Sequence, residues 1–448
     1  MNKQGNKSVY FVGIGGIGMS ALARYYHSQG AQVSGYDLTP SPLTAELENE
    51  GMAIHYEDNP ALLPALIDMA VYTPAVPNDL KEMEVLRQRG IPMMKRAEAL
   101  GAISKTRYTI AVAGTHGKTT TTAMVAHILH KNGVDMTAFI GGIANNFGSN
   151  LHIGHTEESV LVVEADEFDH SFLQLSPDIS IVNSMDADHL DIYGDKQQLI
   201  AGFNAFARLT SRCVISKESL PLETDGTLHY HFGFQEQNEF RAVNVSQHEG
   251  ETDFEIEHPE GLTHVHLKMA GTHNVLNATA AFSATLELGL DPQDIAEALS
   301  SFTGVKRRFD IIVKNERHCY IDDYAHHPEE IKSCLSAIKA SFPSKRVTLV
   351  FQPHLFTRTR DFMEDFAASL AMADDLILLD IYPAREKPIE GITSQALLEK
   401  IAMSNKCICP KEQLLDVIAE RKPELLVTMG AGNIDRLVEP LKNMISQW

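Results

Sequence analysis

Residues 108–122 read YTIAVAGTHGKTTTT, and this stretch decides how the middle of the chain folds. An apolar run typical of a buried strand leads into a loop with glycines, and a helix is predicted from Thr119 to about His130. A phosphate-binding loop has the pattern G-x-x-x-x-G-K-S/T, but Val112 stands where its first glycine is expected. The stretch therefore predicts a phosphate-binding loop that is tighter than the usual one.

The residues of this loop suit a nucleoside triphosphate. The backbone N–H groups of residues 114–118 would cradle the phosphates, Lys118 would reach the β- and γ-phosphate oxygens, and Thr119 would hold Mg²⁺. The alternative, a loop without a phosphate ligand, leaves the agreement of strand, glycines, lysine and threonine unexplained.

Acidic residues follow two further apolar runs, at 159–167 and 178–189. Glu164 ends the first predicted strand, and doubly wound sheets place their ligands at the carboxyl ends of strands. The acids beside it are Asp166, Glu167 and Asp169, and the second run supplies Asp186, Asp188, His189 and Asp191. So many acids near a triphosphate require divalent cations, and the pattern therefore predicts a magnesium site. The alternative is a solvated acidic loop.

A second glycine turn lies near the N-terminus and reads Gly13-x-Gly15-Gly16-x-Gly18, with Asp37 nineteen residues after the last glycine. Strand, tight turn, helix, strand and acid in this order are typical of a domain that binds a pyrophosphate at a helix N-terminus. Asp37 would then accept hydrogen bonds from a ribose. NAD, FAD and a UDP-sugar all fit this pattern, and a structural glycine turn without a ligand is the alternative.

The chain of 448 residues is long enough for two or three domains, and three α/β blocks are recognisable. Their predicted bounds are 1–106, 107–308 and 309–448. From about 212 to 270 apolar residues alternate with polar ones, which predicts a small antiparallel excursion. The last block alternates strands and helices, as a doubly wound parallel sheet does. The predicted fold class is α/β, with Rossmann-like first and last domains and a central ATPase-type parallel sheet that carries the phosphate loop.

The composition excludes several classes of function. The formal net charge of −21 argues against nucleic acid or an anionic membrane surface as a partner. The apolar residues after Lys7 resemble a secretory signal, but their glycines would break the helix that such a signal needs. No run reaches the roughly 18 apolar residues of a membrane span. Five scattered cysteines fit a reducing compartment, so we expect a cytoplasmic protein.

Arginine and histidine gather at predicted strand ends in the last block, within DDYAHHP and FQPHLFTRTR. Arg358 and Arg360 could clamp a carboxylate or a phosphate, or could pair with Asp361. Arg307 and Arg308 lie at the predicted hinge, where one of them could move onto a γ-phosphate as the domains close.

Together these motifs resemble the Mur ligases of peptidoglycan synthesis, from about residue 8 to the end of the chain. The matching motifs, in chain order, are GIGGIGMSALA, AGTHGKTTTT, EADEFDxSF, DADHLDIYG, GxHNxxNAxAA, VKRRFD, DDYAHHPxE, FQPHxxTRTRDF and YPAREKPIEG. They look closest to the branch that adds L-alanine to UDP-N-acetylmuramate. The resemblance implies a cytoplasmic ligase that works through an acyl phosphate, with these two substrates, and with ATP and two Mg²⁺ ions as cofactors. It implies no nucleic acid or membrane partner, and a monomer or a homodimer.

The resemblance also implies roles for individual residues. The ATP contacts are Gly114, Thr115, His116, Gly117, Lys118, Thr119 and Thr120, with Asn274 and Asn277 near the adenine, Arg308 near the γ-phosphate and Asp323 near the ribose. The catalytic residues are Lys118, Glu164 and His189, and the metal ligands are Thr119, Glu164 and His189. The UDP-sugar contacts are Gly13, Gly15, Gly16, Gly18 and Asp37, and the amino-acid contacts are His326, His354 and Arg358.

Two departures from the family pattern bear on specificity. Several sister ligases carry a carbamylated lysine downstream of the DH pair, whereas this chain has Asn204 there, which favours the L-alanine branch. Many L-alanine ligases have an arginine after FQPH, whereas this chain has Leu355. Three alternatives stay open: a ligase that recycles a murein tripeptide onto the same sugar, an NAD-dependent oxidoreductase, and a non-catalytic scaffold that senses nucleotides.

Overall fold

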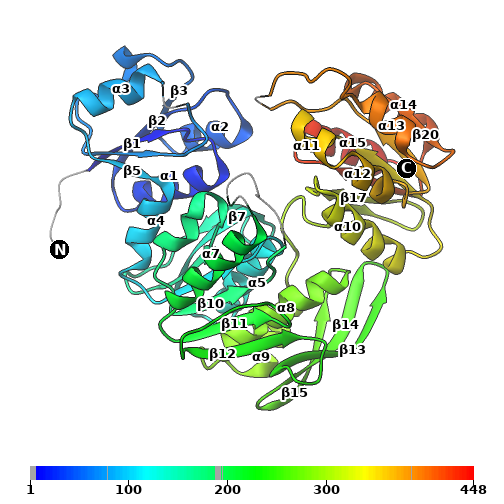
Figure 1. The fold of residues 1–448 in the computed structure, drawn as a ribbon, viewed down its shortest axis with the longest axis horizontal. Helices are drawn as coiled ribbons and strands as arrows, with labels where there is room; N and C mark the ends of the chain where they lie inside the picture. The colour runs from blue at the N-terminus through cyan, green and yellow to red at the C-terminus, as the bar shows by residue number, and fades with distance from the viewer. Residues whose placement is uncertain (1–6, 78, 187–192, 194, 385) are drawn as a thin grey trace. The chain divides into compact units, whose positions relative to one another are not determined.

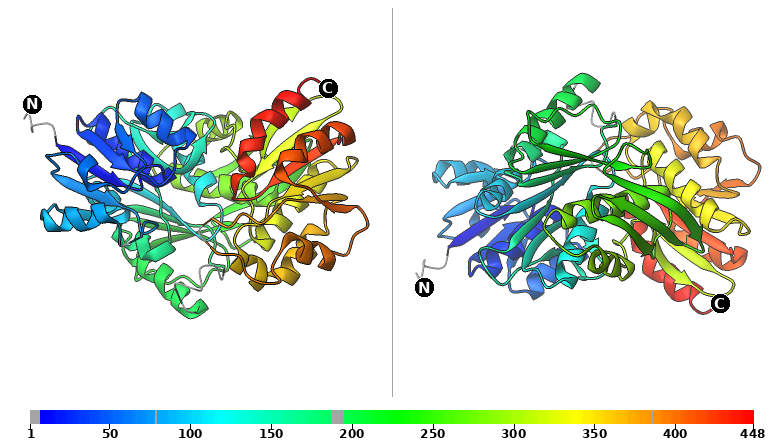
Figure 2. Two further views of the ribbon diagram at one scale, coloured as in Figure 1. Left: turned by 90° about the horizontal axis from the view of Figure 1, so that it is seen from above. Right: turned by 90° about the horizontal axis from the view of Figure 1, so that it is seen from below.

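The structure is a computed structural model that describes residues 7–77, 79–186, 193, 195–384 and 386–448. The chain forms two compact units, whose elements are labelled in Figure 1 and seen from two further sides in Figure 2. The first unit comprises the chain up to Val243 with Ile256–Thr263 and Leu276–Leu299, and the second comprises Asn244–Glu255, His264–Val275 and Ser300–Trp448.

A five-stranded parallel sheet with the order β3-β2-β1-β4-β5 forms the N-terminal part of the first unit. Its strands are β1 (Ser8–Val12), β2 (Gln32–Tyr36), β3 (Ala53–His55), β4 (Met69–Tyr72) and β5 (Met93–Lys95). Its helices are α1 (Ile17–Ser28), α2 (Pro42–Asn49), η1 (Pro60–Leu62), α3 (Lys81–Gln88) and α4 (Arg96–Ser104). The strand order reverses beside β1, so the loop after β1 opens at the crevice where such sheets bind ligands. The prediction of a Rossmann-like first domain is confirmed.

A ten-stranded sheet with the order β15-β14-β13-β12-β11-β10-β6-β9-β7-β8 forms the middle of the chain. Its strands are β6 (Thr109–Ala113), β7 (Met136–Ala144), β8 (Ser149–His152), β9 (Val160–Glu164), β10 (Ile179–Val182), β11 (Cys213–Lys217), β12 (Leu228–Gly233), β13 (Phe240–His248), β14 (Glu251–His258) and β15 (Gly261–Leu267). Its helices are α5 (Lys118–Lys131), η2 (Phe168–Gln174), α7 (Lys196–Arg208), α8 (Thr272–Leu286) and α9 (Pro292–Ser300). Strand β6 has parallel neighbours on both sides, so the loop after it opens onto the carboxyl edge of the sheet.

The antiparallel excursion is shorter than the alternation over residues 212–270 predicts, and a separate antiparallel pair, β7 with β8, lies at the other edge of the sheet. Strand β11 pairs parallel with β10, and β12 pairs parallel with both β11 and β13. The antiparallel excursion begins at β13, where the two-residue turn to β14 has positive φ at Glu249 and Gly250, as tight hairpin turns require. The predicted extent was wrong because alternation reports that one face of a strand is exposed, not the direction in which the strand runs.

A six-stranded sheet with the order β16-β17-β21-β18-β19-β20 lies in the second unit. Its strands are β16 (Asp310–Lys314), β17 (Cys319–Asp323), β18 (Val347–Phe351), β19 (Asp375–Leu378), β20 (Lys406–Ile408) and β21 (Leu425–Met429). Its helices are α10 (Pro328–Ser341), α11 (Phe356–Asp361), α12 (Met363–Leu370), α13 (Ser394–Lys400), η3 (Lys411–Gln413), α14 (Leu414–Arg421), η4 (Asn433–Leu437) and α15 (Val438–Ile445). The last five strands in this order run parallel, as predicted, and β16 adds an antiparallel edge.

Helix α5 and strand β6 hold the predicted phosphate loop between them. All residues of Thr119–Leu129 are buried, so the threonine hydroxyls among them need partners inside the protein. Oγ1 of Thr122 donates to the carbonyl of Lys118 at 2.8 Å, and Oγ1 of Thr121 accepts from Nδ2 of Asn183 at 2.9 Å. Strand β6 is buried along its whole length as well. The loop is therefore held between two buried elements.

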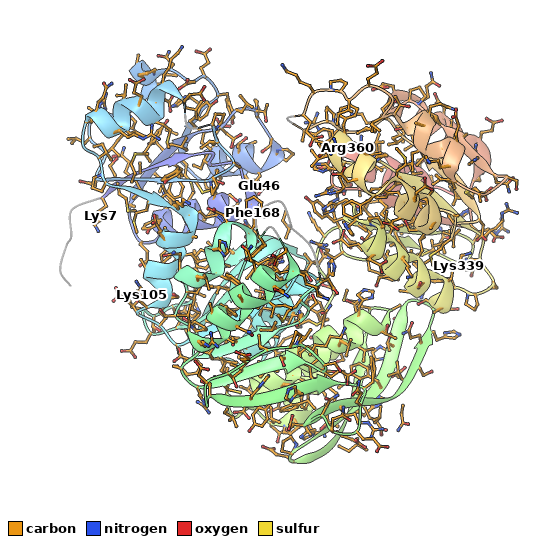
Figure 3. The ribbon with its side chains drawn as sticks, viewed as in Figure 1. Lys7, Glu46, Lys105, Phe168, Lys339 and Arg360 are labelled. Atoms are coloured by element: carbon orange, nitrogen blue, oxygen red, sulfur yellow. The ribbon has the colours of Figure 1, made fainter. Side chains whose placement is uncertain are left out.

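Arg24 on α1 ties the first two sheets together within the first unit. Its guanidinium pairs with Glu46 at 2.9 Å and with Glu50 at 2.8 Å, and it donates to Oδ1 of Asn150 on β8 at 2.9 Å (Glu46 is labelled in Figure 3).

Across the described part of the chain, no helix combines the length and the apolar character that crossing a membrane demands.

Candidate active site

The predicted phosphate loop, Gly114 to Gly117, connects β6 to α5. Ser184, which follows β10, holds this loop in place: its carbonyl accepts the N–H of Thr115 at 3.3 Å, and its Oγ accepts the N–H of His116 at 2.8 Å. Gly114 and Gly117 have φ angles of 136° and 79°, which residues with a Cβ rarely adopt. The ends of two neighbouring strands thus shape the loop.

Two asparagines lie against the loop at Gly117. A Cβ built on Gly117 would lie 2.4 Å from Oδ1 of Asn277 and 2.9 Å from Nδ2 of Asn183. Asn277 is a predicted ATP contact, whereas no motif pointed to Asn183. Asn183 is only 7% exposed, and its Oδ1 has no hydrogen-bond partner among the described residues, which marks a place for a polar ligand or water. Asn274 is also buried, and its Nδ2 donates to the carbonyl of Ala270 at 2.7 Å.

Lys118 begins α5 and is bound by the protein itself. Its Nζ lies 2.8 and 3.0 Å from the two carboxylate oxygens of Glu167 and 2.6 Å from the carbonyl of Gly114. The side chain of Glu167 is 0% exposed and that of Lys118 is 13% exposed. Burial lowers the pKa of Lys118, but the carboxylates of Glu167, Asp166 and Glu164 outweigh it and raise this pKa above its ordinary value. The ammonium therefore stays charged at the loop.

Glu164 ends β9, and its carboxylate contacts the backbone of β7. Oε2 accepts the N–H of Gly141 at 3.0 Å, and a Cβ at Gly141 would lie 2.2 Å from the same oxygen. Thr119 and Thr120 are each 6% exposed at the start of α5. Hydroxyl and carboxylate oxygens suit Mg²⁺, which takes its other ligands from water and phosphates, so Thr119 and Glu164 fit a magnesium site. The third predicted ligand, His189, lies outside the described residues.

The acids that follow Glu164 have partners of their own. Asp166 pairs with Arg96 at 3.1 Å, and Asp169 pairs with Lys95 at 2.9 Å. Both cations lie where β5 meets α4, so these ion pairs join the middle of the chain to the first sheet. Within the described ranges, no group of three or more His, Cys, Asp or Glu side chains could hold a metal ion by itself. The predicted acids Asp188 and Asp191 lie outside the described residues.

The N-terminal glycine turn connects β1 to α1, whose first residue follows Gly16. The N–H of Gly15 donates to Oδ2 of Asp37 at 2.7 Å, so this carboxylate shapes the turn. The predicted contact of Asp37 with a ribose stays a prediction. A Cβ at Gly18 would lie 2.8 Å from Nη1 of Arg96, so this glycine allows α1 and α4 to pack closely.

The three predicted amino-acid contacts lie together in the second unit. The ring centroids of His326 and His354 are 5.9 Å apart, and Nη1 of Arg358 lies 3.3 Å from Nδ1 of His354. Tyr382 opens the motif YPAREKPIEG but was not predicted as a site residue, and its ring stacks on that of His354 with the centroids 5.7 Å apart. Burial, with the neighbouring His326 and Arg358, lowers the pKa of His354 to about 4, so this imidazole is neutral at pH 7. Leu355, the residue that departs from the family pattern, has a φ of 72°.

Arg308 and Asp323 also lie in the second unit. Asp323 ends β17, and its carboxylate accepts the N–H groups of Phe309 and Ala325, both at 2.7 Å. Burial raises the pKa of Asp323 even though Arg308 opposes it. The guanidinium of Arg308 lies 5.1 Å from the centroid of the Tyr324 ring, within the range of a cation–π contact.

Arg307, the other arginine of the predicted hinge, is engaged within the second unit. Its Nε donates to Oδ2 of the buried Asp322 at 3.1 Å, and its guanidinium also bonds to the carbonyl of Gly430. Burial raises the pKa of Asp322 to about 6, although Arg307 opposes this shift. Because Arg307 is held by these contacts, Arg308 is the better candidate for a phosphate contact.

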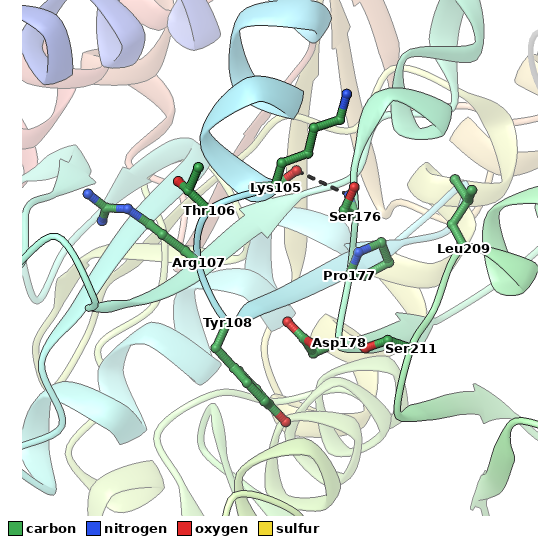
Figure 4. Close-up of a pocket in the computed structure, with 10 residues that line it drawn as sticks. Lys105, Thr106, Arg107, Tyr108, Ser176, Pro177, Asp178, Leu209 and Ser211 are labelled. Atoms are coloured by element: carbon green, nitrogen blue, oxygen red, sulfur yellow. Dashed lines mark hydrogen bonds between the residues drawn. The ribbon is translucent and has the colours of Figure 1, made fainter.

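A cavity of about 420 Å³ lies at the opposite edge of the central sheet (Figure 4). Its lining includes Lys105, Arg107, Tyr108, Asp178 and Ser211. Asp178 accepts hydrogen bonds from the N–H of Thr109 and from Oγ of Ser211, each at 2.8 Å. These residues precede their strands, whereas the phosphate loop and Glu164 follow theirs, so this cavity is separate from the candidate site.

Comparisons with known proteins cover the whole chain. The "Mur ligase family, catalytic domain" model matches residues 8–108, the "Mur ligase middle domain" model matches 112–285, and the "Mur ligase, glutamate ligase domain" model matches 307–432. A UDP-N-acetylmuramate–L-alanine ligase of Cytophaga hutchinsonii is 46% identical over 459 residues, which cover 100% of this chain and 98% of the relative.

Two solved structures extend the comparison. The crystal structure of a UDP-N-acetylmuramate–alanine ligase from Thermotoga maritima has a TM-score of 0.84 and 29% identity, and the match covers 98% of this chain and 100% of that one. A murein peptide ligase from Psychrobacter arcticus has a TM-score of 0.74 and 23% identity over 99% of both chains, and so shares the fold. The predicted three-domain α/β fold is thereby confirmed. With family models matched in order along the chain and a relative 46% identical from end to end, this chain belongs to the Mur ligase family.

Proposed function

We propose that this chain is an ATP-dependent ligase that joins L-alanine to the lactyl carboxylate of UDP-N-acetylmuramate, a cytoplasmic step of peptidoglycan synthesis. The end-to-end similarity to UDP-N-acetylmuramate–L-alanine ligases carries this proposal. The loop at Gly114–Gly117 supports it, because a glycine loop that leads from a parallel strand into a helix presents backbone N–H groups to phosphates.

Three parts of the chain would take the three substrates. Residues 1–106 bind the UDP-sugar at the N-terminal glycine turn, residues 107–308 bind ATP at the phosphate loop, and residues 309–448 bind L-alanine near His354. The enzyme acts in the cytoplasm as a monomer or a homodimer.

The first half-reaction would activate the sugar. An oxygen of the lactyl carboxylate attacks the γ-phosphorus of ATP, the bond to the β,γ-bridging oxygen breaks, and ADP leaves an acyl phosphate behind. Both reactants are anions, so Lys118 and the loop N–H groups must offset their repulsion. Thr119, Glu164 and His189 would hold Mg²⁺, as two ions, and this would supply the remaining positive charge.

The second half-reaction would form the amide. The neutral amine of L-alanine attacks the acyl carbon, the tetrahedral intermediate expels inorganic phosphate, and the nitrogen loses a proton. The guanidinium of Arg358 suits the α-carboxylate of the amino acid. Because His354 is neutral at pH 7, it does not repel the α-ammonium group of the incoming substrate.

Phosphate release tests this function. ATP, Mg²⁺ and UDP-N-acetylmuramate are supplied with either L-alanine or the stem tripeptide. We expect release that requires both the sugar and L-alanine. Release with the tripeptide alone would instead assign the chain to the ligases that recycle a murein tripeptide; the fold relative from Psychrobacter arcticus is named a murein peptide ligase. No release with either would leave a nucleotide-binding scaffold.

Gly141→Ala is expected to raise the Mg²⁺ concentration needed for half-maximal activity by about tenfold. The new Cβ would lie 2.2 Å from Oε2 of Glu164, so the carboxylate must turn away from its place. A Mg²⁺ titration of phosphate release measures this shift, and Glu164→Gln provides the reference for loss of the ligand. An unchanged Mg²⁺ requirement in folded Gly141→Ala protein would contradict the metal role of Glu164.

A further inference from the structure

Lys118 and Glu167 form the most buried ion pair near the phosphate loop in the described part of the chain. An ammonium has three N–H donors. The two oxygens of Glu167 and the carbonyl of Gly114 lie within 3.0 Å of Nζ and account for all three. A phosphate oxygen can therefore bind Lys118 only by replacing one of these acceptors.

Glu167 is the acceptor that can be exchanged. The carbonyl of Gly114 belongs to the loop, which β6 and β10 hold on both sides. The carboxylate of Glu167 sits on a side chain with rotatable bonds, at the start of η2. Its backbone is anchored separately, because the hydroxyl of the buried Tyr193 donates to the carbonyl of Glu167 at 2.7 Å. The carboxylate therefore has rotatable bonds of its own, whereas the carbonyl of Gly114 can move only with the loop.

The neighbouring acids of this segment do not share this arrangement. Asp166 and Asp169 pair with Arg96 and Lys95, and their side chains are 34% and 37% exposed, whereas that of Glu167 is 0% exposed. A carboxylate so fully removed from water interacts with its partner cation far more strongly than an exposed one does. It would also repel a triphosphate that approaches the same cation.

We propose that Glu167 is a positioning residue for Lys118: it holds the charged ammonium at the phosphate loop and gives it up to the phosphate oxygens when ATP binds. The inference deepens the proposed function, because it concerns the same ATP site. Glu167 orients Lys118 before the nucleotide arrives, and the exchange lowers the affinity for ATP. Its role is thus distinct from that of a magnesium ligand.

Calorimetric titration with ATP in EDTA tests this role without magnesium and without turnover. Glu167→Gln is expected to lower the Kd for ATP about tenfold, because no carboxylate competes for Lys118. Asp169→Asn removes the same charge from the same segment and serves as the matched control, with a Kd expected to change less than about twofold. Glu167→Asp, which withdraws the carboxylate from Nζ, is expected to shift the Kd in the same direction by a smaller factor.

Two outcomes would overturn the proposal. The first is unchanged or weaker ATP binding by folded Glu167→Gln protein in EDTA. A parallel titration with Mg²⁺ then gives the reason: no effect there would mean a merely structural role, and an effect there would mean a metal ligand. Thermal unfolding of the nucleotide-free protein checks the pair itself: Lys118→Met should lower the Tm, and adding Glu167→Gln should recover part of the loss. No recovery would also refute the pairing. ATP binding needs no amide formation, so failure here is distinguishable from failure of the ligase assay.

Discussion

Lys118→Ala is expected to lower turnover by about a thousandfold or more. The side chain starts α5 at the phosphate loop and carries the cation that must offset two approaching anions, the lactyl carboxylate and the triphosphate. No other described cation bonds to the carbonyl of Gly114 at the base of this loop. Phosphate release in the presence of UDP-N-acetylmuramate and L-alanine measures the effect.

From the sequence alone, we expect Lys118→Ala to leave the fold intact. The structure instead predicts that this substitution lowers the stability of the protein. Removing Lys118 takes the ammonium away from the carboxylate of Glu167, which is 0% exposed. Breaking a buried ion pair in this way costs about 3–5 kcal/mol. The double variant Lys118→Ala/Glu167→Gln removes both charges and is the proper control for folding. Appreciable turnover in either variant, once shown to be folded, would refute the phosphate-loop assignment.

Gly117→Ala is expected to weaken ATP binding and turnover about a hundredfold. Its φ of 79° is strained for alanine, and the new Cβ would lie 2.4 Å from Oδ1 of Asn277 and 2.9 Å from Nδ2 of Asn183. Relief of these contacts must move the loop or the two asparagines, which lie beside the loop at Gly117. Calorimetric titration with ATP measures the change in Kd.

Gly133→Ala is a control variant that introduces backbone strain without steric crowding by the new Cβ. Gly133 follows the other end of α5 with a φ of 69°, but a Cβ there would meet no atom within 4 Å. This variant should lose stability of the order of 1 kcal/mol and keep its affinity for ATP. Equal losses of ATP affinity in the two variants would show that helix stability, rather than the space beside Gly117, governs binding.

Local patterns account for the parts of the fold that were predicted correctly. The apolar run of β6, the glycines after it and the helix from Lys118 are neighbours in the chain, so their spacing alone specifies strand, loop and helix. The same holds for the N-terminal turn and for Glu164 at the end of β9. In each case the predicted site residues lie within a few residues of the sequence pattern that reveals them.

Residues recruited from other strands could not be predicted in this way. Asn183 follows β10 and lies outside the matching motifs, whereas Tyr382 opens the motif YPAREKPIEG, which by itself gave it no role. Each of them lies beside predicted site residues of its own sheet, because parallel strands bring their carboxyl ends to one edge of that sheet. The directions of β11 and β12 were missed for a related reason, since alternation is the same in parallel and antiparallel strands that expose one face.

The sequence by itself determined the α/β class, the position of the glycine loop between β6 and α5, and the resemblance to the Mur ligase family. It also showed that Asp166, Glu167 and Asp169 lie near one another. Only the tertiary structure decided which cation each of them meets. The backbone turns through a φ of 53° at Asp169, and Asp166 and Asp169 pair with the first sheet while Glu167 lies against Lys118. Which cation a carboxylate pairs with depends on the direction of its side chain and on how deeply that side chain is buried. The spacing of residues within a loop specifies neither.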